Sequence, residues 1–200
     1  MKAETITMYT CQTKPVTDAI MRDGISYVKQ KYIDYKYQDI AWIFKEAYHF
    51  FNHHAVQILT RPEQAESPVW VFHDPKWAQP DQGSSQLKLE IPLDEIILFD
   101  LRKWNRILNL NLIGTKEEEE KFARELESWR IQDSSDVFAG DFYPMLKNKI
   151  KKSWKKLFED SEEILRELQE GRFRQFGNED TDYIQGAVWC LKEKWIQNEI

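Results

Sequence analysis

The stretch from Leu87 to Asn109 constrains the fold most, because consecutive local signals in it specify consecutive elements. From Leu87 to Ile91, apolar residues alternate with charged ones, which is the period of a strand with one buried face. Pro92 brings no amide hydrogen to a strand ladder, so it ends this alternation. The apolar run Ile96–Phe99 then predicts a second, more central strand.

A helix is expected directly after this second strand. Asp100 is placed as its N-cap, since its carboxylate can accept the free backbone amides of the first turn. Leu101, Trp104 and Ile107 share one face at helical spacing, and the basic side chains between them point away from that face. We therefore expect Trp104 to be buried.

Other strands and helices are expected on both sides of this stretch. The last expected strand is too apolar to lie at the edge of a sheet, and we expect it to pair near the first strand and close the sheet. The five expected strands are Thr5–Gln12, Val69–Phe72, Leu87–Ile91, Ile96–Phe99 and Ile184–Leu191. The helices outside the central stretch are expected at Pro15–Arg22, Asp39–Leu59, Lys116–Ile131 and within 142–169.

The order of these elements predicts an α+β fold in a single domain that covers residues 1–200. Its core is expected to be a small mixed sheet of about five strands, flanked by helices. Residues 115–170 are expected to form a C-terminal helical insert or lobe that packs against the sheet, and residues 183–200 to return to the sheet.

Charge and cysteine content limit the partners and the compartment. The formal net charge is −6, whereas proteins that coat nucleic acid or anionic membranes need a basic surface. No stretch has the apolar length of a membrane span, so we expect no membrane partner. Cys11 and Cys190 lie far apart in apolar surroundings, which is typical of free thiols in a reducing cytoplasm.

Motifs for catalysis or metal binding are weak. His49 and His53 are spaced to share a helix face, but no third ligand is fixed by spacing, so we expect no metal. Cys11 has no nucleophile signature around it, and no glycine-rich phosphate loop is present. No residue is therefore assigned to catalysis, and whether the protein is an enzyme stays open.

Polar residues near the ends of the expected strands are the best candidates for a ligand site. A buried polar group needs a hydrogen-bond partner, which is either the protein itself or a ligand. We expect a cleft where the first strand meets Ile184–Leu191, close to His73, with Trp70 available for stacking. The candidate ligand-binding residues are Thr10, Gln12, Trp70, His73 and Gln185.

Several short motifs, in order along nearly the whole chain, resemble a bacterial and phage family of domains of unknown function, DUF3841. They are MYTCQ, IMRDG, SPVWVF, EIILFDLRKWNRILN, WKKLF and IQGAVW. The run IILFDLRKWNRILN is the most specific of them. This resemblance implies a shared domain and brings no activity with it.

A looser resemblance is to the ADP-ribosyltransferase-like folds, whose opening order of strand, helix and glycine is similar to the start of this chain. In those folds three strands contribute a polar residue, an aromatic residue and an acid that hold NAD. The resemblance implies Thr10 or Gln12 in the first role, Trp70 in the second and Gln185 in the third. Gln185 lacks a carboxylate, which favours ligand binding over catalysis.

Two functions from different classes follow. The first is a domain that binds a small molecule or nucleotide, with NAD as a candidate ligand. The alternative is a protein-interaction module, a phage or host accessory protein whose aromatic residues bind a protein partner. A flat exposed patch that includes several of Tyr27, Tyr32, Tyr35 and Tyr37 would favour the alternative.

Overall fold

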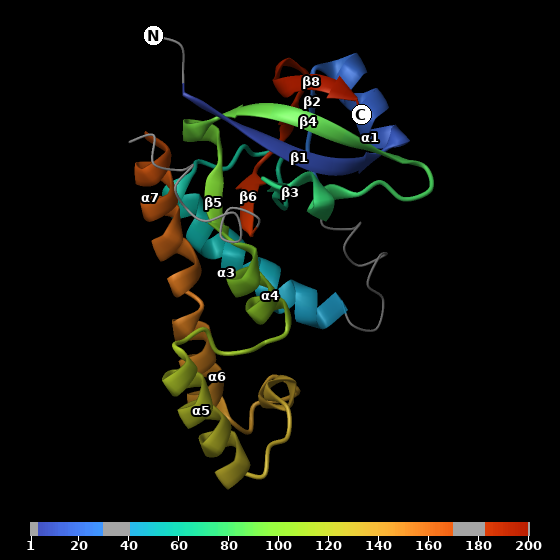
Figure 1. Cartoon of the computed structure of the whole chain (residues 1–200). Helices are drawn as coiled ribbons and strands as arrows, with labels where there is room; N and C mark the ends of the chain where they lie inside the picture. The colour runs from blue at the N-terminus through green and yellow to red at the C-terminus, as the bar shows by residue number, and fades with distance from the viewer. Residues whose placement is uncertain (1–3, 30–40, 170–182, 200) are drawn as a thin grey trace.

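The computed structural model describes residues 4–29, 41–169 and 183–199 of the chain, which form the helices and strands shown in Figure 1. The strands are β1 (Thr5–Thr13), β2 (Ile25–Ser26), β3 (Val69–Phe72), β4 (Ser84–Pro92), β5 (Ile97–Asp100), β6 (Ile184–Val188), β7 (Leu191–Lys192) and β8 (Ile196–Glu199). The α-helices are α1 (Lys14–Asp23), α3 (Ala41–Ile58), α4 (Leu101–Leu108), α5 (Lys116–Ser128), α6 (Pro144–Ser153) and α7 (Lys156–Gln169). Short 3-10 helices are η2 (Pro75–Ala78), η3 (Leu93–Glu95), η4 (Ser134–Val137) and η5 (Glu193–Trp195).

One six-stranded sheet organises the fold, in the order β5-β6-β3-β1-β4-β8, and β2 and β7 form a second, two-stranded sheet. This confirms the α+β class and places all five expected strands in one sheet. The expectation of a mixed sheet is wrong for the described strands, since every pairing between them is antiparallel. Parallel neighbours need crossover connections that run the length of the sheet, and here β1 instead pairs antiparallel with β4 along its whole length.

The last expected strand is shorter than predicted and lies in the interior of the sheet. β6 pairs with β5 on one side and with β3 on the other, as its apolar sequence indicates. Because β3 separates β6 from β1, the expectation that the first and last strands meet is wrong. The strand ends at Val188, and the chain turns at Trp189 and Cys190 before it forms β7.

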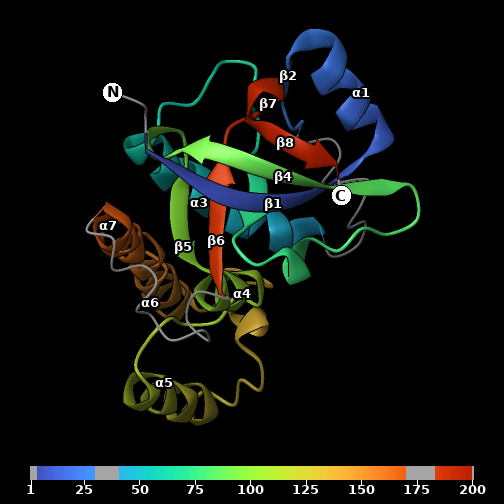
Figure 2. The same cartoon turned by 45° about the horizontal axis from the view of Figure 1, so that its top comes forward.

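The two faces of the large sheet are covered by different elements (Figures 1 and 2). One face packs on α3 and α4 through a cluster rich in aromatic side chains, among them Phe51, Phe99 and Trp104. The other face packs on α1 and the β2–β7 sheet through a mainly aliphatic cluster that includes Met8 and Ile20. Side chains that alternate along β3, β5 and β6 supply both clusters, whereas β1 and β4 supply the aliphatic one.

The central stretch forms the predicted strand, turn, strand and helix. The Asp100 carboxylate caps α4 by accepting a hydrogen bond from the backbone nitrogen of Arg102, at 2.7 Å. Trp104 is 3% exposed, which confirms that it lies in the core. β4 begins at Ser84, earlier than predicted, because its polar first residues pair with the end of β1.

The helices α5, α6 and α7 form the predicted lobe, and α5 and α6 extend away from the sheet (Figure 1). Thr115 and Glu118 form a capping box at the start of α5. Trp154 at the end of α6 is fully buried and belongs to the same cluster as α3 and α4. A core shared by the lobe and the sheet is what we expect if residues 1–200 form a single domain. The single-domain assignment stays a prediction. No helix in the described ranges is both long and apolar enough to cross a membrane.

Candidate functional site

A fork between β1 and β3 opens a cleft of about 280 Å³, which we call the fork cleft. β1 follows β4 from Thr5 to Thr13, whereas Tyr9 opposite Phe72 is its one register pair with β3 among the described residues. Beyond this pair β1 stays with β4 and β3 stays with β6, so the sheet splits. The lining residues are Thr10, Cys11, Gln12, Val28, Tyr48, Ser67, Pro68, Val69, Trp70, Phe72, Trp77 and Ala78.

Thr10, Gln12 and Trp70 are three of the five predicted site residues, and they meet in this cleft. The Thr10 hydroxyl donates to the backbone carbonyl of Trp70 at 3.0 Å and thereby bridges the two strands where the sheet splits. The side-chain amide nitrogen of Gln12 donates to Thr10 Oγ1 at 2.8 Å. Because this amide is bonded only through its nitrogen within the described part of the chain, the Gln12 carbonyl oxygen can accept from a ligand.

The Trp70 ring is fixed from behind by α3 and α4. Its Nε1 donates to the Tyr48 hydroxyl at 2.7 Å, and its ring centroid lies 4.7 Å from that of Trp104. Tyr48 also lines the cleft. The core therefore holds both aromatic side chains in place before any ligand binds, which lowers the ordering cost of binding.

Trp77 forms the exposed aromatic wall of the cleft, and its ring is 41% exposed. The Asp74 carboxylate caps η2 through the backbone nitrogen of Lys76, at 2.8 Å. The buried Gln86 amide ties η2 to β4 by donating to the carbonyls of Pro75 and Ala78, each at 2.9 Å. A short but well-anchored turn thus positions the Trp77 ring at the cleft, where its centroid lies 6.0 Å from that of Tyr183 and 5.6 Å from the Lys76 ammonium.

Ser67 lines the cleft and has a buried hydroxyl that lacks a hydrogen-bond partner among the described residues. The residue is 1% exposed. Its backbone is held by a bridge to Val28. A buried hydroxyl without a partner costs roughly 1–3 kcal/mol, a cost that a small shift toward a ligand atom would remove.

The other two predicted site residues lie elsewhere. The backbone nitrogen of His73 donates to the Ile184 carbonyl at 3.0 Å, and its ring Nδ1 lies 3.2 Å from the Thr7 carbonyl, beyond the fork. Gln185 is 2% exposed within β6, opposite Phe72 and Phe99, and does not line the cleft. Its Oε1 has no partner among the described residues.

Sequence reasoning missed the contributions of Tyr48, Ser67 and Trp77. A local signal was available for Trp77, because it lies in a short helix that begins with a capping residue, Asp74, followed by a proline in the first turn. Tyr48 and Ser67 come from a helix and a loop that only tertiary packing brings to the fork.

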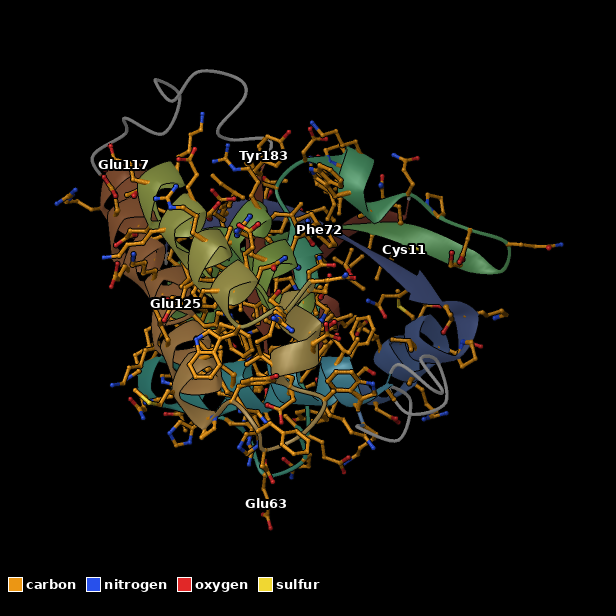
Figure 3. All side chains as sticks on the ribbon, turned by 90° about the horizontal axis from the view of Figure 1, so that it is seen from below. Cys11, Glu63, Phe72, Glu117, Glu125 and Tyr183 are labelled. Atoms are coloured by element: carbon orange, nitrogen blue, oxygen red, sulfur yellow. The ribbon has the colours of Figure 1, made fainter. Side chains whose placement is uncertain are left out.

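The fork cleft is uncharged, which limits its chemistry. None of its described lining residues is Lys, Arg, Asp or Glu. The Cys11 thiol donates to the Ser84 hydroxyl at 3.1 Å, and no described lining residue is a histidine or carboxylate that would act as its base. Figure 3 shows Cys11 and Phe72 close together, away from Glu117 and Glu125 of α5. The arrangement suits binding of a planar ring rather than covalent chemistry.

The histidines considered as metal ligands lie on the outer face of α3. His49 and His53 are both exposed and line a shallow hollow with Glu66. Within the described ranges no three histidine, cysteine or acidic side chains are grouped to hold a metal ion.

The model of a domain of unknown function, DUF3841, matches residues 7–197. The chain belongs to this family. Membership in DUF3841 confirms the resemblance drawn from the motifs between MYTCQ and IQGAVW. No curated protein and no solved structure matches the chain, so the likeness to ADP-ribosyltransferase-like folds gains no support from these comparisons. The fork cleft lies within the DUF3841 region.

Proposed function

We propose that the protein binds a nucleotide through its planar ring in the fork cleft, with the nicotinamide end of NAD as the first candidate. The observation that carries this proposal is the pairing of fixed aromatic faces with polar atoms that have hydrogen-bonding capacity left. Trp77 offers a stacking surface, and Gln12 and Ser67 offer an acceptor and a hydroxyl. Phosphates would lie outside, since the described lining supplies no positive charge.

Binding is a better hypothesis than turnover. An ADP-ribosyltransferase-like reaction needs a carboxylate to stabilise positive charge that develops on the ribose. Gln185, the residue implied in that role, is a buried neutral amide outside the cleft. We therefore propose recognition of the ligand without assigning any catalytic residue.

Isothermal titration calorimetry with NAD, nicotinamide mononucleotide and AMP tests this proposal. We expect Gln12→Ala and Trp77→Ala each to weaken binding at least about tenfold, because each removes a direct ligand contact worth about 1.4 kcal/mol or more. Gln132→Ala, which changes an exposed glutamine between α5 and η4, is the matched control and should bind like the wild type. Absence of heat with all three ligands, or binding unchanged in both cleft variants, would remove the proposal.

A second candidate function, binding of a protein partner, is favoured by exposed apolar residues at the end of the helical lobe. Trp129, Phe142 and Met145 are 58%, 88% and 85% exposed. Tyr27 is half-buried, and the other tyrosines of the expected patch lie outside the described residues. A partner that copurifies with the wild type and is lost in Phe142→Ser but retained in Gln12→Ala would support this function.

A further inference from the structure

A second cleft, of about 210 Å³, lies between β7 and the C-terminal end of α3, and we call it the β7 cleft. Its walls come from β2 and the residue after it, from the end of α3, from η3 and from the segment 189–195. Tyr27 lines the β7 cleft and its neighbour Val28 lines the fork cleft, so the two clefts are separate sites on either side of this segment.

Trp195 lines the β7 cleft and has an indole hydrogen-bond donor, Nε1–H, without an acceptor among the described residues. A small shift of the side chain, which is 2% exposed, would make this donor available to a ligand. By contrast, Nε1 of Trp189 in the same cleft donates to the Leu59 carbonyl at 3.0 Å, and Nε1 of Trp154 donates to the Asn111 carbonyl at 2.8 Å. The indole donors of Trp70, Trp154 and Trp189 thus have acceptors, whereas that of Trp195 has none among the described residues.

The position of Trp195 is fixed by charged neighbours that neutralise each other. The Lys192 ammonium lies 5.0 Å from the centroid of the Trp195 ring and also pairs with the Glu95 carboxylate. These two are the charged side chains among the described lining residues. Among the described lining residues, a ligand with a net charge would therefore meet no uncompensated counter-charge, whereas a neutral ligand would keep the Glu95–Lys192 pair intact. A further charge is that of Arg61, whose guanidinium carbon lies 5.9 Å from the centroid of the Trp189 ring without Arg61 being a lining residue.

The remaining walls are aromatic and apolar. Tyr27 and Trp189 line the cleft together with Trp195, and the buried Cys190 thiol lies among them. Aromatic walls favour a planar ring, and the single unused N–H favours one strong acceptor. We propose that the β7 cleft binds a small uncharged molecule with an aromatic ring and a carbonyl group, whose oxygen accepts the hydrogen bond from Trp195 Nε1.

Nuclear magnetic resonance of the ¹⁵N-labelled protein tests this proposal, because indole N–H groups give signals separate from the backbone. Benzamide is the probe, since it combines a ring with a neutral carbonyl group. Benzoate has the same ring with a negative charge, and toluene has the ring without an acceptor. We expect benzamide to shift the Trp195 Nε1–H signal downfield and to bind at least about tenfold more tightly than benzoate or toluene.

Trp195→Phe assigns the signal and should weaken benzamide binding about tenfold while keeping an aromatic wall. Should this variant fail to fold, Overhauser contacts from the benzamide ring protons to Trp195 and Tyr27 in the wild type locate the ligand directly. Gln12→Ala should bind benzamide at the β7 cleft as the wild type does, which separates this site from the fork cleft. An unmoved Trp195 signal, or equal shifts with benzoate and toluene, would overturn the proposal.

Discussion

Replacement of Trp104 by alanine should remove a large share of the stability of this protein. The Trp104 ring is 3% exposed, and its centroid lies 5.5 Å from that of Phe51, 5.9 Å from Tyr48 and 4.7 Å from Trp70. A buried aromatic side chain removes roughly 150–250 Å² from water, which at about 25 cal/mol per Å² gives about 4–6 kcal/mol as an upper bound. Partial collapse of the cavity lowers the expected loss to about 3–5 kcal/mol.

Urea unfolding followed by circular dichroism measures this loss. With a slope of about 2–3 kcal/mol per molar urea, the midpoint should fall by about 1–2.5 M. Trp129→Ala is the matched control, because the same side chain is removed where it is 58% exposed, and it should change stability by less than about 1 kcal/mol. Equal losses in the two variants, or a Trp104→Ala midpoint unchanged from the wild type, would refute the burial argument.

Three further predictions concern a glycine, an acid and a thiol. A Cβ at Gly186 would lie 2.6 Å from Ile96 Cδ1, so Gly186→Ala should cost about 1–3 kcal/mol of stability. Adding Ile96→Val to this variant should recover part of the loss in thermal melts, because it removes the clashing Cδ1 atom. Additive effects of the two substitutions would contradict this. Burial raises the pKa of Asp160 above its ordinary value, so the folded state holds this proton more tightly, and the contribution of this carboxyl to stability should fall as pH rises from about 4 through the raised pKa. The stability of the wild type relative to Asp160→Asn, measured by urea unfolding, should therefore decrease over that pH range, and a difference independent of pH would count against it. Burial also raises the pKa of the Cys190 thiol, so iodoacetamide at pH 8 should label the partly exposed Cys11 first, as mass spectrometry would show; equal labelling rates would contradict this.

Local signals in the sequence were sufficient for most of the fold. Val69–Phe72 and the cap at Asp100 are where the alternation and the capping chemistry place them. β4 extends beyond its predicted start because Ser84–Gln86 pair through their backbone, which leaves no trace in apolar periodicity. The order of the strands in the sheet could not be predicted from the sequence, since it depends on which apolar faces meet when the chain collapses.

The same distinction applies to the site. Thr10, Gln12 and Trp70 were predicted together and line one cleft, because they lie on strands that meet at a fork. Gln185 was grouped with them on the expectation that the first and last strands meet, and β3 lies between those strands. Trp77 was missed because its role depends on the anchoring of η2 by Gln86, a contact between residues whose sequence patterns are unremarkable.

The interior position of β6 has a consequence for how the chain folds as it leaves the ribosome. β3 and β5 flank β6 in the sheet, yet both are synthesised more than 80 residues earlier. Until β6 arrives, the facing sides of β3 and β5 present unpaired backbone groups, and such open strand edges promote aggregation. The two facing edges can close only when residues 184–188 have been made and pair with both strands.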